Sequence, residues 1–205
     1  MKDRKFSEGQ IITVGGMDWY VLYSVHDRVK CISKSPVGKS CYRAGFTGYE
    51  LCGSDISVRL NDAYKDFVQT DSCLSRMVLD MVLPQETDDG IRYGANIVCK
   101  FGLITPYEYR KHRRCLPDRA ITSTWTAGLT SACDLQMNVQ YIDENGAIYP
   151  HKMFEEHDFR ATCVFDRYEL IDYLERQDEK RKTAITTVQE MVRRFNIKSS
   201  EVFAG

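Results

Sequence analysis

The chain has 205 residues, of which 43% are apolar and 28% charged, so it has enough apolar material for a packed core and is not a largely disordered chain. Its 28 basic and 29 acidic side chains give a formal net charge of −1, which excludes a surface built throughout to bind nucleic acid or an anionic membrane. No run approaches the roughly 18 apolar residues of a membrane span, and residues 1–9 lack the apolar segment of a signal peptide, so we expect a cytoplasmic protein.

The opening of the chain predicts a β-meander. Residues 10–14 are apolar and β-branched, and Gly15-Gly16 supplies a turn. Residues 19–23 and 29–33 continue the pattern as two further strands. A long connection containing several glycines and serines then runs over residues 35–53.

A fragment of a phosphate-binding loop occurs in this connection. Gly38-Lys39-Ser40 matches the end of the GxxxxGKS motif, but Ser33 occupies the position of the first glycine. A working loop joins a buried parallel strand to a helix, whereas this segment lies in a β-rich region interrupted by glycine. We therefore expect no nucleoside triphosphatase activity.

The middle of the chain predicts helices. Ser54 suits an N-cap, and the apolar residues from Ile56 to Phe67 recur at helical spacing. We expect a second short helix over residues 73–81, a strand over 96–105, and a short helix that has Pro106 in its first turn.

The next part of the chain returns to short strands and turns. We expect strands over residues 121–126, 137–142 and 159–165, and a hairpin turn at Asn145-Gly146, because both of these residues tolerate positive φ. Strands at both ends with helices between them indicate an α+β domain over residues 6–166 rather than a βαβ array.

Residues 167–205 predict a helical tail. Four apolar residues, Ile185, Val188, Val192 and Phe195, lie at heptad spacing, whereas residues 175–182 (ERQDEKRK) contain no apolar side chain. One interpretation is a helix whose two ends dock on the domain; the other is a coil that binds a partner or a second copy. We expect the coil to form a homodimer. Asn196 suits a C-cap that ends this helix.

The cysteines do not predict a site. Eight of them are spread along the chain without a CxxC pair, whereas a structural zinc site normally takes two thiolates from one turn. We interpret most of them as small buried residues, with Cys99 and Cys163 on strands. The acidic stretches Asp88-Asp89 and 143–145 lack the spaced oxygen ligands of a calcium loop, so we expect no metal and no cofactor.

Several short motifs occur in the order of the landmarks of a bacterial and phage domain. They are Gly9-Gln10-Ile11-Ile12, Trp19-Tyr20-Val21-Leu22, Ser54 to Asn61, Phe101 to Tyr109, and Phe159 to Val164. In this order and spacing the chain resembles the DUF6273 domain, over about residues 6–168. That domain is similar in turn to the C-type-lectin-like fold of formylglycine-generating enzymes and of the variable proteins of diversity-generating retroelements.

The resemblance implies a twisted antiparallel sheet, two flanking helices and a loop-rich face. Two departures from the family pattern put its site in doubt. The late aromatic block keeps only Trp125 and lacks the following arginine, and the closing Arg-Pro motif is Arg160-Ala161 here.

Two features of the sequence suit partner binding. Trp125 stands among small polar residues, which is compatible with an exposed aromatic as well as with a core residue. A basic run lies beside an aromatic residue and could be a solvated helix face or a surface for phosphate or an acidic protein. The residues of this second feature are Tyr107, Arg110, Lys111, Arg113 and Arg114. A further aromatic group is Tyr42, Phe46 and Tyr49.

The hypothesis that fits these features best is a non-enzymatic recognition module that binds a protein partner. An inhibitor that a phage or mobile element directs at a host protein is one concrete version. Two alternatives stay open. One is an enzyme related to formylglycine-generating proteins, which would need a reactive thiol. The other is a nucleic-acid-associated protein that uses the basic run together with residues 180–182 and 193–194.

Overall fold

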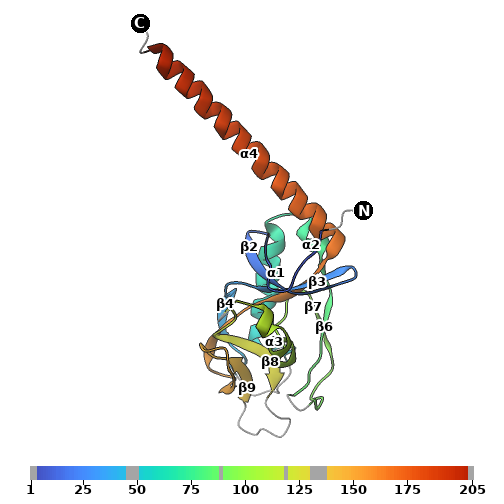
Figure 1. Ribbon diagram of the computed structural model, residues 1–205. Helices are drawn as coiled ribbons and strands as arrows, with labels where there is room; N and C mark the ends of the chain where they lie inside the picture. The colour runs from blue at the N-terminus through green and yellow to red at the C-terminus, as the bar shows by residue number, and fades with distance from the viewer. Residues whose placement is uncertain (1–3, 45–50, 88–89, 118–119, 130–137, 203–205) are drawn as a thin grey trace.

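The computed structural model describes the chain except for residues 1–3, 45–50, 88–89, 118–119, 130–137 and 203–205, and except for the side chains of residues 194–202. It is an α+β structure with several antiparallel sheets and a long C-terminal helix (Figure 1). The largest sheet has the strand order β1-β2-β3-β12-β5. These strands are β1 (Ile11–Val14), β2 (Met17–Val25), β3 (Arg28–Ser33), β12 (Thr162–Asp166) and β5 (Val78–Leu79).

The predicted β-meander is confirmed. Gly15 and Gly16 have φ values of 58° and 74°, which places Val14 opposite Met17 in a tight hairpin. Along β1, Ile12 and Val14 are buried while the residues before each of them are exposed, as expected for a strand with one face on the core. β2 then pairs with β3 after a two-residue turn.

The last strand of the domain lies in the middle of this sheet. β12 pairs with β3 on one side, where Cys163 is opposite Cys31, and with β5 on the other, where Phe165 is opposite Val78. The strand expected over residues 159–165 is divided in two, because β11 (Glu156–Phe159) pairs instead with β4 (Gly38–Cys41). The Gly-Lys-Ser fragment therefore lies in a strand, which agrees with its exclusion as a phosphate-binding loop.

Helix α1 (Asp55–Gln69) covers the sheet and begins where the sequence predicts. Ser54 Oγ accepts a hydrogen bond of 3.2 Å from the backbone N–H of Ser57, which satisfies one donor of the first turn. Phe67 on its buried face packs edge-on against Trp19, with ring centroids 5.6 Å apart. Phe101 and Phe165 pack against the same Trp19 ring, so four aromatic rings form the centre of the core.

A second layer lies at the end of the domain opposite the C-terminal helix (Figure 1). It contains a three-stranded sheet of the order β10-β9-β8, in which the Asn145-Gly146 hairpin joins β9 to β10 as predicted. Its strands are β8 (Thr124–Leu129), β9 (Asn138–Ile142) and β10 (Ile148–Lys152).

Three predicted elements are wrong in extent. The strand expected over residues 121–126 is β8, which begins at Thr124 and runs on to Leu129. The helix expected over residues 73–81 is only the turn α2 (Leu74–Met77), since Val78 changes to extended backbone and begins β5. The strand expected over residues 96–105 is only β7 (Ile97–Cys99), which pairs with β6 (Met81–Leu83) in a two-stranded ribbon.

Helix α4 (Arg167–Val202) has two parts. Asp166 Oδ1 accepts hydrogen bonds from the backbone N–H groups of Tyr168 and Glu169, which caps its first turn. The buried side chains of this part then extend the core past the expected boundary at residue 166; they are Leu170, Ile171, Tyr173 and Leu174. Residues 178–193 are exposed, and the helix projects far beyond the domain (Figure 1).

The projection of α4 bears on one of the two interpretations of the tail. A helix with both ends docked on its own domain is wrong, because the helical backbone leads away from the domain (Figure 1) and residues 178–193 are exposed. The expected end at Asn196 is also wrong, since the helical backbone runs on to Val202. Among the described helices, none combines the length and apolar character that a membrane span requires.

Candidate functional site

The basic run lies on helix α3 (Pro106–His112) and the 3-10 turn η1 (Arg113–Cys115) that follows it. Thr105 and Glu108 form a reciprocal capping box: Thr105 Oγ1 accepts from Glu108 N, and Glu108 Oε2 accepts from Thr105 N, both at 3.1 Å. This cap fixes the start of α3 and hence its rotation. Tyr109 and His112 are buried as a result.

The side chains of Tyr107 and the four predicted cations face outward. Tyr107 is 70% exposed, and the Nζ atom of Lys111 lies 6.0 Å from the centre of its ring. Arg113 lies 5.7 Å from the ring centre of Tyr109, on another part of the surface. Arg110 and Arg114 are also exposed. The structure therefore brings Tyr107 and Lys111 together but spreads the cations around the helix.

A cleft of about 620 Å³ lies beside α3. Tyr107, Lys111 and His112 line it from the helix, and Tyr23 of β2 and Lys30 of β3 line it from the sheet. The His112 side chain is almost fully buried, and its ring packs against that of Tyr23, with the ring centroids 5.6 Å apart. The cleft thus has an aromatic wall supported by the main sheet, and it is lined by charges of both signs, Lys30 and Lys111 together with Glu8 and Glu108.

An ion pair closes the floor of this cleft. Lys30 Nζ binds Glu108 Oε1, and the two side chains are only 6% and 16% exposed. Because the other oxygen of Glu108 accepts from Thr105, both carboxylate oxygens have partners within the protein. Glu108 therefore anchors α3 to the sheet, and removal of one partner would leave a buried charge uncompensated.

A second acidic group lies at the edge of the cleft. Glu8 Oε2 is 3.4 Å from His112 Nδ1. A hydrogen bond from the Cys115 thiol lowers the pKa of Glu8, and the neighbouring His112 lowers it further. Glu8 is therefore ionised at neutral pH and partly balances the cations of α3.

Trp125 is not part of this surface, and the prediction of an exposed aromatic at this position is wrong. The side chain is 0% exposed, and its Nε1 atom donates a hydrogen bond of 3.0 Å to the carbonyl oxygen of Ser40. Its ring packs against those of Tyr42, Tyr141 and His157. All six residues of β8 are buried, so the small polar neighbours that suggested a surface position line the interior instead.

Tyr42 is also 0% exposed, and Phe46 and Tyr49 lie outside the described residues.

The projecting part of α4 exposes the predicted apolar seam. Ile185 is 58%, Val188 59% and Val192 53% exposed, and Met191 beside them is 63% exposed. The side chain of Phe195, the next seam position, lies outside the described part of the chain. A contiguous row of exposed aliphatic side chains on one helix is unusual for a monomer.

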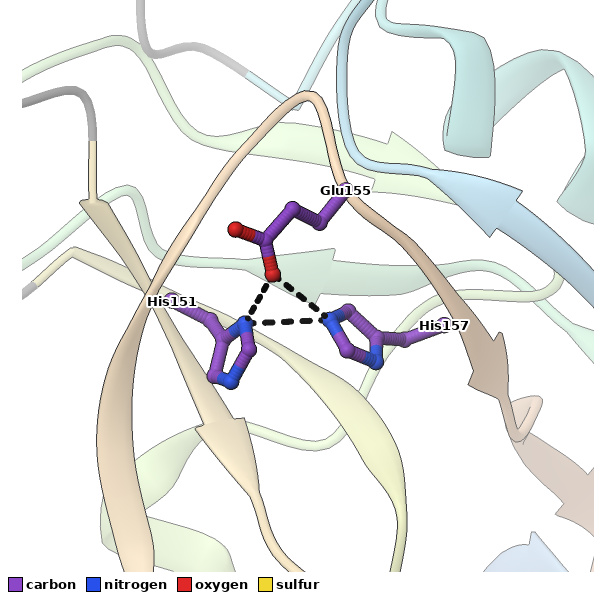
Figure 2. Close-up of side chains that lie close together, drawn as sticks. All are labelled: His151, Glu155 and His157. Atoms are coloured by element: carbon purple, nitrogen blue, oxygen red, sulfur yellow. Dashed lines mark hydrogen bonds and ion pairs between the residues drawn. The ribbon is translucent and has the colours of Figure 1, made fainter.

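A cluster of three titratable groups was missed in the sequence (Figure 2). His151 belongs to β10, His157 to β11, and Glu155 to the connection between them. Burial lowers the pKa of His157, and the neighbouring His151 lowers it further. The available signal in the sequence was the spacing HxxxExH, which places two imidazoles and a carboxylate on one short segment.

Of the acidic residues considered for calcium, Asp143 has a structural role in the described part of the chain. Asp143 Oδ1 accepts hydrogen bonds from the backbone N–H groups of Asn145 and Ala147, so it stabilises the hairpin turn. Asp88 and Asp89 lie outside the described residues.

Comparison of the chain with models of protein families, with curated proteins and with solved structures finds no match. The resemblance to the DUF6273 domain therefore stays a prediction.

Proposed function

We propose that this protein is a non-enzymatic recognition module that binds an acidic protein partner and forms a homodimer through α4. The observation that carries the proposal is the exposed apolar seam on a helix that projects from the domain. Burial of such a seam against a second helix removes its side chains from water, which is favourable by about 25 cal/mol per Å² of apolar area. The proposed setting is the cytoplasm, and the proposed fold is a C-type-lectin-like variant of the α+β domain.

The charges of α4 favour an antiparallel dimer. Asp178 and Arg181 occupy the same heptad seam as Val188 and Val192, so a parallel coil would place each charged residue opposite its own copy. Asp178 also contacts Arg4 of its own chain, at 3.4 Å. An antiparallel pair with Val188 opposite Val192 of the second copy places Asp178 and Arg181 far from the same residues of the other copy. It also keeps the two domains at opposite ends of the coil.

The cleft beside α3 is the proposed recognition surface. Tyr107 offers exposed aromatic area, and Lys111 beside it offers a cation that suits a carboxylate on a partner. The other exposed cations of α3 and η1 add a local positive charge to a chain whose net charge is near zero. An inhibitor directed at a host protein is the concrete version of this proposal.

Six cysteines of the described chain favour a binding role over thiol chemistry. Every cysteine with a resolved shift has its pKa raised, and burial raises the pKa of Cys99 to about 11. A nucleophilic thiol needs a lowered pKa. The cysteines with raised values are Cys31, Cys41, Cys73, Cys99, Cys115 and Cys163.

Light scattering on the full chain tests the dimer. The wild type should have the mass of two chains, and the double variant Val188→Asp, Val192→Asp should have the mass of one. The matched control is Thr183→Asp with Thr187→Asp, which introduces the same charges at the same spacing on the other side of the helix and should stay dimeric. A monomeric wild type, or a dimer that tolerates aspartate at both seam positions, contradicts the proposal.

Capture from host lysate tests the recognition surface. The expected result is a protein captured by the wild type and lost with Tyr107→Ala plus Lys111→Glu. It should be retained by the matched control Tyr149→Ala plus Lys65→Glu, in which both residues are exposed and neither lines the cleft. Capture that disappears after nuclease treatment would instead support the nucleic-acid alternative.

A further inference from the structure

The segment that joins β10 to β11 is held in place by the rest of the domain. Met153 in its middle is buried, and its carbonyl oxygen accepts a hydrogen bond of 2.9 Å from the backbone N–H of Arg43. The backbone N–H of Glu155 donates to the carbonyl oxygen of Lys152 at 3.1 Å, which forms a turn. The two strands that flank this turn pair with different partners, β9 and β4. Glu155 is therefore placed by backbone structure between the two histidines.

Aromatic side chains restrain both imidazole rings. The His157 ring lies 4.4 Å from the ring centre of Tyr141 and 5.0 Å from that of Trp125. The His151 ring lies 5.1 Å from Tyr141 and is nearly perpendicular to His157, at an interplanar angle of 84°. Trp125 is fully buried and is fixed by its hydrogen bond to Ser40. The aromatic rings beside the two histidines therefore cannot move without disturbing the core.

Three donor atoms converge on one point (Figure 2). His151 Nδ1 is 3.0 Å from His157 Nε2 and 2.9 Å from Glu155 Oε2, and His157 Nε2 is 3.6 Å from the same oxygen. The second nitrogen of each ring points away from the cluster (Figure 2). A point about 1 Å out of the plane of the three atoms lies about 2.1 Å from each, which is the bond length that zinc makes with histidine and carboxylate ligands.

We propose that His151 Nδ1, Glu155 Oε2 and His157 Nε2 bind one divalent transition-metal ion of the zinc class. Two imidazoles and one carboxylate suit zinc and its neighbours, whereas Ca²⁺ and Mg²⁺ take sets of oxygen ligands. This proposal differs from the expectation of no metal, which was drawn from cysteine pairs and acidic loops alone.

The site has an open side. The side chains of His151 and Glu155 are 35% and 44% exposed, so solvent reaches the cluster. Three protein ligands leave at least one position of a four-coordinate ion for water or for a donor atom of a bound molecule. A structural zinc site is normally closed by four protein ligands, so this ion is available to an external ligand.

Titration of the full-length protein with Co²⁺, followed by the visible absorption of the bound ion, tests the proposal. The wild type should saturate at one ion per chain, and Zn²⁺ should displace the Co²⁺ and raise the melting temperature. His157→Gln should weaken binding at least about 100-fold, more than the loss of a residue that only supports a ligand. Ca²⁺ and Mg²⁺ should have no effect.

Two further variants make the test independent of folding. Glu155→Gln replaces a solvent-accessible side chain by one of equal size, so it should weaken Co²⁺ binding at least about 10-fold without a change in the melting temperature of the metal-free protein. The matched control is His26→Asn, which removes an exposed histidine at a turn with φ of 50° and installs a residue that tolerates this conformation. Failure of the wild type to bind Co²⁺, or equal binding by wild type and Glu155→Gln, would overturn the proposal.

Discussion

Replacement of Leu170 by alanine should destabilise the whole domain, although this residue belongs to the projecting helix α4. Leu170 is 0% exposed and lies in the main core cluster together with Phe165. A fully buried leucine replaced by alanine costs about 2–5 kcal/mol, from lost burial and from the cavity left behind. A loss near 3 kcal/mol is a large part of the total stability of about 5–15 kcal/mol. It corresponds to a decrease of about 6–12 °C in melting temperature for a chain of this size.

Chemical denaturation followed by circular dichroism measures this loss. The matched control is Val58→Ala, which shortens an aliphatic side chain on α1 that is 54% exposed, and should change the unfolding free energy by less than about 0.5 kcal/mol. If Leu170→Ala changes the free energy of unfolding no more than Val58→Ala does, the first turns of α4 do not complete the core. In that case the domain would end at residue 166, as the sequence indicates.

Two other substitutions should have measurable effects. Trp125→Ala should cost about 3–5 kcal/mol in unfolding free energy, because it empties a fully buried site; a fold of unchanged stability would contradict the burial of this ring. A hydrogen bond of 2.8 Å from Thr13 lowers the pKa of Asp18, so the stability that this bond contributes is present above the ordinary pKa of an aspartate and is lost as the pH falls through the lowered value. Thr13→Val should therefore raise the pKa of Asp18 in an NMR titration, and an unchanged value would contradict this account.

The elements that could be predicted are those determined by neighbouring residues. Gly15-Gly16 and Asn145-Gly146 permit positive φ and give their hairpins directly. Ser54 and the periodic apolar residues after it define α1, and the short helix at Pro106 carries its own cap. Each of these signals acts over a few residues, so no knowledge of the rest of the fold is needed.

The elements that could not be predicted depend on contacts between distant parts of the chain. Trp125 was considered for a surface because its neighbours are small and polar, but β8 is covered on both faces. Thr126, for example, donates a buried hydrogen bond of 2.7 Å to the carbonyl oxygen of Gln140 on β9. The alternation of polar and apolar residues is informative only where one face of a strand meets water.

The difference between local signals and distant contacts also explains which candidate sites could be found in the sequence. The exposed seam of α4 follows from local heptad spacing and was found in the sequence. The histidine cluster needs β10 and β11 to pair with different partners and to turn toward each other, and the spacing of His151 and His157 alone does not show this.

The position of β12 has a consequence for the order of events during synthesis. This strand lies between β3 and β5, so the main sheet cannot be completed until nearly the whole domain has left the ribosome. Contacts of such large sequence separation slow folding, because a long loop must close before they form. Until β12 is inserted, the edges of β3 and β5 offer unpaired backbone groups to other chains. Residues 178–193 follow β12 in the chain, so the exposed apolar side chains of α4 leave the ribosome only after the strand that closes the sheet.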